Sequence, residues 1–134
     1  MLVVTRFVVE PDRSGGSVDG FVDGFVDGFV DGFVARAHTA LAALAACAGY
    51  RAGRLARALD DPAYWCLVTE WESVGAYRRA LSSYDVKLHA TPLLAESVDE
   101  PSAYEVLGAA APGGTVEVSA SDRAPDGAQL PSRS

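Results

Sequence analysis

Apolar and polar positions along the chain first predict its strands. Residues 2–10 (LVVTRFVVE) are rich in β-branched side chains and stop at Pro11, which is typical of a strand. Residues 50–59 and 63–71 also favour strands, and the DDP turn at residues 60–62 indicates that they form a hairpin. The alternation of residues 50–59 breaks around Gly53, which predicts a bulge there. A last strand is predicted at residues 102–107 (SAYEVL).

Helical spacing predicts three helices between these strands. The first ends near Gly49, and its apolar positions recur with a period of three to four residues: Val30, Phe33, Val34, Ala37, Leu41 and Leu44. Ser73 can cap a second helix whose apolar stripe is Val74, Tyr77 and Leu81. A short third helix is indicated by Thr91 as cap and Pro92 in first position.

The order of these elements predicts the fold. Strand, helix, strand, strand, helix, short helix and strand give a ferredoxin-like β-α-β-β-α-β fold of the α+β class, with four antiparallel strands and helices on one face. We assign residues 1–107 to this domain, a size that supports one hydrophobic core. From residue 108 large apolar residues become scarce while Gly, Pro, Ser and Asp accumulate, so residues 108–134 are predicted to form a disordered tail.

The strand at residues 63–71 is apolar on both of its faces. One face would carry Trp65 and Leu67, and the other Tyr64 and Val68. Helices that cover one face of the sheet would leave the other as a large apolar patch in water unless a second subunit buried it. The pattern therefore predicts a back-to-back homodimer, the dimeric α/β barrel arrangement.

Residues 18–34 repeat the unit FVDG in register. A strand would place Phe and Asp together on one face, whereas a helix advances about 400° per unit and keeps the phenylalanines drifting slowly along one side. The aspartates recur at every fourth residue, which does not match the alternate ligand positions of a calcium loop. We interpret the repeat as a tandem expansion at the N-terminal end of the first helix that the fold does not require. Its glycines predict fraying of the early units.

The charge distribution and the N-terminal sequence argue against nucleic acid and membranes as partners. The formal net charge is −7, more than half of it from the repeat, and the rest of the chain shows no basic stripe for nucleic acid. No signal peptide and no apolar run of about 18 residues is present, so we expect no membrane partner and a cytoplasmic location. Two widely spaced histidines and the lack of a glycine-rich phosphate loop predict neither a metal site nor a nucleotide cofactor.

One passage resembles a known family. Residues 64–94, YWCLVTEWESVGAYRRALSSYDVKLHATPLL, contain a strand-ending Trp71, a helix tyrosine Tyr77 and a downstream His89. With the element order, this pattern resembles the antibiotic biosynthesis monooxygenase superfamily of small dimeric α+β barrels. The resemblance covers roughly residues 1–107 without the repeat.

The superfamily includes several functions. Some members are cofactor-independent oxygenases of polyketide anthrones and quinols, others degrade haem, and many have no known activity. Resemblance to the anthrone oxygenases implies that Trp71 and Tyr77 line a pocket, although their asparagine four residues before the tryptophan is here Leu67. The haem-degrading relatives carry a histidine about ten residues past the tryptophan and an asparagine in the first strand; here Leu81 holds the former position, and the chain contains no Asn.

The candidate chemistry follows from this resemblance. An electron-rich phenol or anthrone supplies its own electrons, so the protein needs only a pocket, a hydrogen-bond partner or base, and shelter from water. Trp71 can supply an aromatic wall and an indole N–H, Tyr77 a phenol, and His89 an imidazole. The expected partners are a small aromatic substrate and molecular oxygen, without a cofactor. The alternatives are a haem-binding or haem-degrading relative and a non-catalytic dimeric ligand-binding module, with Trp71 and Tyr77 in core packing and His89 on the surface.

Overall fold

The structure is a computed structural model that describes the backbone of residues 1–9 and 19–121. Side chains are described for residues 1–9 and 30–121. The predicted end of the first strand at residue 10, the first residue of the repeat and residues 122–134 of the predicted tail lie outside this range.

Four antiparallel strands form the sheet. They are β1 (Leu2–Val8), β2 (Tyr50–Arg57), β3 (Tyr64–Trp71) and β4 (Ala103–Tyr104), in the order β2-β3-β1-β4. β1 lies between β3 and β4, with Phe7 opposite Trp65 and Leu2 opposite Tyr104. This order and the element sequence confirm the predicted ferredoxin-like α+β fold.

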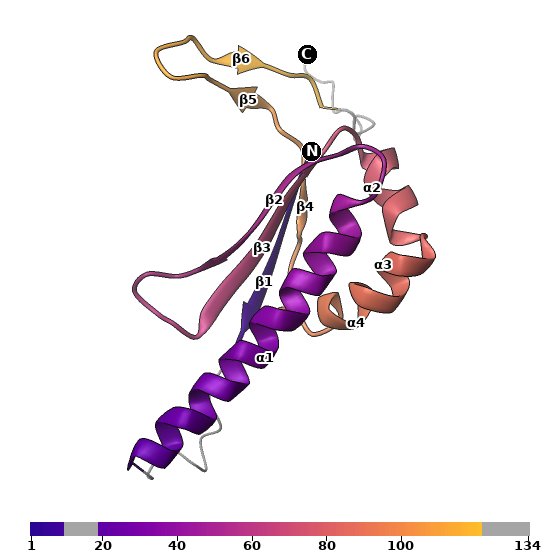
Figure 1. The fold of residues 1–134 in the computed structure, drawn as a ribbon. Helices are drawn as coiled ribbons and strands as arrows, with labels where there is room; N and C mark the ends of the chain where they lie inside the picture. The colour runs from indigo at the N-terminus through magenta and orange to yellow at the C-terminus, as the bar shows by residue number, and fades with distance from the viewer. Residues whose placement is uncertain (10–18, 122–134) are drawn as a thin grey trace. The chain divides into compact units, whose positions relative to one another are not determined.

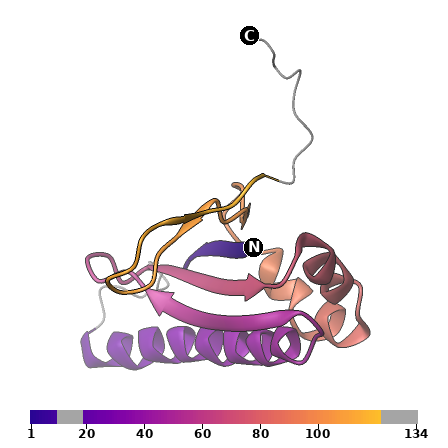
Figure 2. The same cartoon turned by 90° about the horizontal axis from the view of Figure 1, so that it is seen from above.

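The helices cover one face of the sheet, as Figures 1 and 2 show. They are α1 (Asp19–Ala45), α2 (Val74–Leu81), α3 (Tyr84–His89) and α4 (Thr91–Leu94). The predicted Ser73 cap is confirmed, because its side chain accepts a hydrogen bond from the Ala76 N–H at 3.1 Å. α4 begins at Thr91 itself rather than after it, and no side chain caps it.

The predicted first helix is confirmed, and the FVDG repeat is helical from Asp19 onward. On its described part, the buried residues are Phe33, Ala37, Ala40 and Leu44. Their spacing places them along one side of the helix, and the two alanines allow the helix to approach the sheet closely. Figure 1 shows the N-terminal end of α1 continuing past the end of the sheet.

Gly53 does not form the predicted bulge, and Gly49 forms the turn after α1. The β-bulge lies between Tyr50 and Ala52 rather than at Gly53. At Gly53 an added Cβ would meet the end of the Leu41 side chain and the Tyr50 hydroxyl, so the glycine leaves room for these two side chains where α1 approaches the strand. Gly49 has a φ of 88°, which explains why the chain reverses there after α1.

The buried side of α2 also differs from the predicted stripe. Ala76 and Ala80 are buried, whereas Val74, Tyr77 and Leu81 are only half-buried. A Cβ at Gly49 would collide with the Ala76 Cβ, so α2 lies directly against the turn that follows α1. Only small side chains fit at this contact.

Residues after Tyr104 belong to a second compact unit. Within it, β5 (Gly108–Ala109) pairs antiparallel with β6 (Glu117–Val118), and Gly113 adopts a positive φ of 73° between them. The sequence predicts a disordered tail over this stretch, and the structure places a short hairpin in its described part. Among the described residues, no helix is long and apolar enough to span a membrane.

Candidate functional site

Trp71 lies at the end of β3 and is completely enclosed. Its ring is 1% exposed, and its indole N–H donates to the Thr69 hydroxyl at 2.8 Å. Thr69 can accept this bond because residues two apart on a strand share a face. The N–H that the sequence suggests for a ligand is therefore already engaged inside the protein.

Tyr77 projects from α2 onto the Trp71 ring. The two ring centroids are 5.5 Å apart, so the structure brings together two of the three predicted site residues. Among the described residues, the Tyr77 hydroxyl has no hydrogen-bond partner. Burial raises the pKa of the Tyr77 phenol above its ordinary value of 10.0, so this hydroxyl stays protonated and can donate at neutral pH.

Tyr50 completes this aromatic cluster from the other side, and the sequence did not single it out. It is paired with Trp71 across β2 and β3, and their ring centroids are 5.3 Å apart at an interplanar angle of 86°. Edge-to-face contact of this kind holds the Trp71 ring in place. A sequence signal was present, because Tyr50 begins the hairpin strand directly after Gly49.

His89 lies elsewhere, exposed at the C-terminal end of α3. It lines a hollow of about 310 Å³ between α1 and the α3–α4 segment, together with residues such as Thr39, Pro92 and Leu93. Trp71 and Tyr77 do not line that hollow. The structure therefore does not bring His89 to the Trp71–Tyr77 pair.

Leu67 occupies the position that carries an asparagine in the anthrone oxygenases. Its side chain is buried at 2% exposure on the helix-covered face of β3. This position therefore contributes an apolar contact to the core and offers no polar group to a ligand.

Two other hollows lie on the helix-covered side of the sheet. One, of about 430 Å³, is lined by the C-terminal end of α1 and by α2 and α3, and contains Cys47, Arg79 and Ser83. The Cys47 thiol lies 3.9 Å from the Ser83 hydroxyl, and both cysteines of the chain are free. The second, of about 330 Å³, lies where β1 meets α1, and Phe7 and Phe33 form part of its wall.

A helix-covered antiparallel sheet with a tryptophan–tyrosine pair between its third strand and second helix defines a class of small α+β proteins. The family model described as antibiotic biosynthesis monooxygenase matches residues 25–91, half of the chain. The chain belongs to the antibiotic biosynthesis monooxygenase family. The match begins inside the FVDG repeat and ends at the first residue of α4.

Solved structures share this fold. A conserved protein from Methanosarcina mazei Go1 is 19% identical, with a TM-score of 0.53 over 76% of this chain and 84% of that one. SnoaB, a cofactor-independent oxygenase from Streptomyces nogalater, is 24% identical, with a TM-score of 0.52 over 79% of this chain and 94% of that one. Among curated proteins, none matches this chain significantly. At these identities the structural matches show the fold alone.

Proposed function

We propose that the protein is a cofactor-independent monooxygenase that acts on an electron-rich aromatic molecule of the anthrone, quinol or polyketide type. The observation that carries the proposal is the Tyr77 hydroxyl, which is half-buried against Trp71, protonated at neutral pH and without a partner among the described residues. Membership of the family supports the reaction class. The shared fold with SnoaB, named a cofactor-independent oxygenase, is consistent with it.

The chemistry requires little from the protein. Loss of a proton converts an anthrone into an electron-rich anion that transfers electrons directly to molecular oxygen. The methylene carbon loses its two C–H bonds and becomes a carbonyl, while the second oxygen atom leaves as water, so the substrate supplies all the electrons. The Tyr77 O–H donates a hydrogen bond to the substrate oxygen on which negative charge develops. The enclosed Trp71 holds the Tyr77 ring in position.

Two further elements of the proposal concern the base and the assembly. His89 as the base stays a prediction, since it lies apart from Tyr77 on its own hollow. A homodimer is proposed because the helix-free face of the sheet carries apolar side chains that a single chain leaves partly exposed, among them Val4, Val8 and Tyr64. A second copy packed on this face would remove them from water.

Tyr77→Phe tests the proposed role of the hydroxyl. The substitution keeps the ring on Trp71, so the protein should fold, while oxygen consumption with the best substrate should fall about 10²- to 10³-fold, the usual effect of removing one hydrogen-bond donor to a developing negative charge. Tyr50→Phe is the matched control, because the same atom is removed from the other ring that contacts Trp71, and its rate should be unchanged. Equal rates for wild type and Tyr77→Phe would remove Tyr77 from the mechanism. His89→Ala in the same assay lowers the rate only if the imidazole is the base.

A further inference from the structure

The connection between α4 and β4, residues 95–102, leads from the helix layer to the edge of the sheet (Figure 1). None of its residues is buried, and Val98 is only half-buried. Segments with few buried apolar contacts open locally at a low free-energy cost, and lids over binding sites are drawn from such segments. The hydrophobic core therefore contributes little to holding residues 95–102 closed.

Two arginine–glutamate pairs hold this segment instead. Arg36 of α1 donates two hydrogen bonds to the Glu96 carboxylate, of 2.5 and 3.2 Å. Arg6 of β1 donates two to the Glu100 carboxylate, of 2.5 and 2.9 Å. Thr5 and Phe7 are buried on the helix-covered face of β1, so Arg6 projects from the opposite face. The segment is therefore fixed from both layers of the fold.

Both pairs are ionised and accessible to water. The hydrogen bond from its arginine lowers the pKa of each glutamate carboxyl, and the positive charge of that arginine acts in the same direction. The side chains of Arg6 and Arg36 are 51% and 49% exposed. Dissolved salt screens ion pairs of this kind, so the strength of both pairs depends on the ionic strength.

One backbone hydrogen bond lies between the two ion pairs. The Val98 N–H donates to the Arg6 carbonyl at 2.7–2.9 Å, a usual length, and it breaks when the segment moves away from β1. The Val9 N–H, by contrast, donates to the Ala63 carbonyl beside β3, on the other side of β1. The two amides therefore report separately on the segment and on the sheet.

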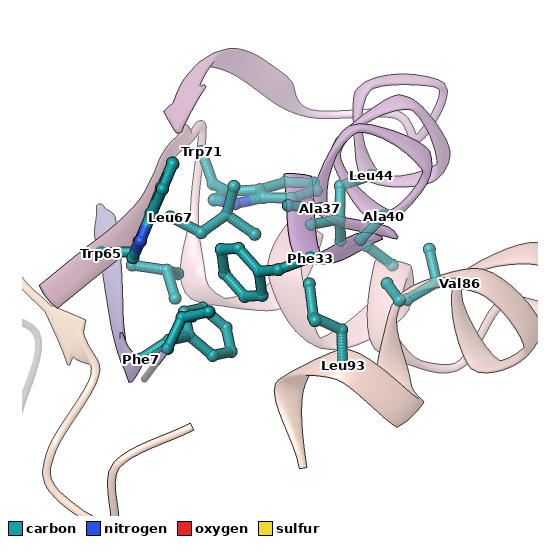
Figure 3. Close-up of a cluster of buried hydrophobic side chains, with 14 of the residues drawn as sticks. Phe7, Phe33, Ala37, Ala40, Leu44, Trp65, Leu67, Trp71, Val86 and Leu93 are labelled. Atoms are coloured by element: carbon teal, nitrogen blue, oxygen red, sulfur yellow. The ribbon is translucent and has the colours of Figure 1, made fainter. Parts of the chain in front are cut away.

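The segment forms part of the wall of the hollow of about 330 Å³ where β1 meets α1. Arg36 and Glu96 line this hollow together with Phe7 and Phe33, whose rings meet edge-on at a centroid distance of 5.3 Å (Figure 3). Movement of Glu96 away from Arg36 removes a charged part of the wall. The hollow is then open to water on that side.

We propose that residues 95–102 are a lid over this hollow, held closed by the Arg36–Glu96 and Arg6–Glu100 pairs and released when either pair is screened or loses its charge. The lid controls the access of small molecules to the hollow. This role goes beyond the proposed oxygenase activity and does not depend on it.

Hydrogen exchange followed by NMR tests the lid. In Glu96→Gln and in Glu100→Gln, which keep the size of the side chain, the protection factor of the Val98 N–H should fall about two- to fivefold, the usual strength of one exposed ion pair. Addition of about 1 M salt should lower it in wild type but not in the double variant. The protection factor of the Val9 N–H should not change. All samples have one protein concentration, because Arg6 lies on the face proposed to form the dimer.

Equal protection of the Val98 N–H in wild type and in the double variant would overturn the proposal. An equal loss of protection at Val9 would overturn it as well, because the whole sheet would then open rather than the lid. The same conclusion would follow if salt had no effect on wild type.

Thiol labelling measures access to the hollow itself. Val9 lines the hollow, and Val9→Cys in a Cys66→Ser background places a thiol in its wall. Alkylation of this thiol should be faster in Arg36→Glu, which repels Glu96, and should return toward the original rate in Arg36→Glu with Glu96→Arg, which restores the pair. Cys47 lines a different hollow, so its labelling rate is an internal control and should stay constant. Unchanged alkylation in Arg36→Glu, or no recovery in the exchanged pair, would contradict the lid.

Discussion

Trp71 is held by one buried hydrogen bond and by two aromatic rings that contact it from β2 and α2. Thr69 is 2% exposed, and its hydroxyl is the acceptor for the Trp71 indole N–H. Tyr50 and Tyr77 pack against the ring with centroid distances of 5.3 and 5.5 Å. The position of the Tyr77 hydroxyl, on which the proposed chemistry depends, is therefore set by the orientation of Trp71.

Thr69→Val tests this hydrogen bond. The substitution keeps the shape of the side chain but leaves the Trp71 N–H buried and unpaired, which should lower the free energy of unfolding by about 1–3 kcal/mol. In a Trp71→Phe background the same substitution should cost much less, because no donor remains to be stranded. Urea denaturation of the four proteins measures the coupling. Equal costs in both backgrounds would show that the bond does not stabilise the fold.

The sequence predicts the Trp71–Tyr77 pair, but it does not show which polar groups of the aromatic residues find hydrogen-bond partners. Alternation places Trp65 and Trp71 on the same face, and it does not by itself say which indole finds an acceptor. The signal lay two residues earlier on the same face, where Trp71 has Thr69 and Trp65 has Ala63. The position of His89 could not be predicted, because it depends on how the short helices α3 and α4 turn the chain away from α2.

The contact of α2 with the turn between α1 and β2 depends on Gly49. This residue has a positive φ of 88°, and a Cβ there would collide with the Cβ of Ala76, which has no freedom to move away. Gly32, by contrast, lies in α1 with nothing within 4 Å of an added Cβ. The two glycines therefore respond oppositely to the same substitution.

Gly49→Ala should lower the free energy of unfolding by at least about 2 kcal/mol, since left-handed backbone strain and a core collision act together. Gly32→Ala should raise it by about 0.5–1 kcal/mol, because alanine favours a helix interior over glycine. Thermal melts of both variants beside wild type give the measurement. Destabilisation by Gly32→Ala would indicate that the backbone at Gly32 is needed in another conformation.

Long elements could be predicted because their apolar spacing repeats over many residues. Short elements could not be predicted in this way. The strands and the stripe of α1 follow from alternation and helical spacing over many residues. α3 was missed because it spans six residues and buries only Val86, although Ser83 caps it by accepting from the Val86 N–H at 3.3 Å. Gly53 looked like a bulge because sequence cannot show that α1 packs so closely against that strand.

At the scale of the whole molecule, the helix-free face of the sheet and the FVDG repeat are the two features that a single chain leaves without a role. Val68 lies at the centre of that face, paired with Val4 of β1 and Arg54 of β2. The repeat extends α1 past the sheet, and the buried residues of α1 begin only at Phe33 in its described part. We propose that the face forms a homodimer and that the repeat is an expansion outside it.

Sedimentation velocity at micromolar concentration tests both proposals. Wild type should sediment as a dimer, and deletion of residues 21–28, two units in register, should leave the dimer and its melting cooperativity nearly unchanged. Val68→Glu, which places a charge on the face, should give a folded monomer. A monomeric wild type contradicts the dimer, and loss of folding on deletion would show that the repeat is structural.

The central proposal is that the protein oxidises its substrate without a cofactor. Oxygen uptake by purified protein, with a metal chelator present and a panel of anthrones and hydroquinones as substrates, measures this directly. We expect chelator-resistant uptake with at least one substrate, with one molecule of O₂ consumed for each anthrone converted to its quinone. Uptake that never exceeds the rate without protein, or that appears only after haem is added, would contradict it and favour a ligand-binding module or a haem-binding relative.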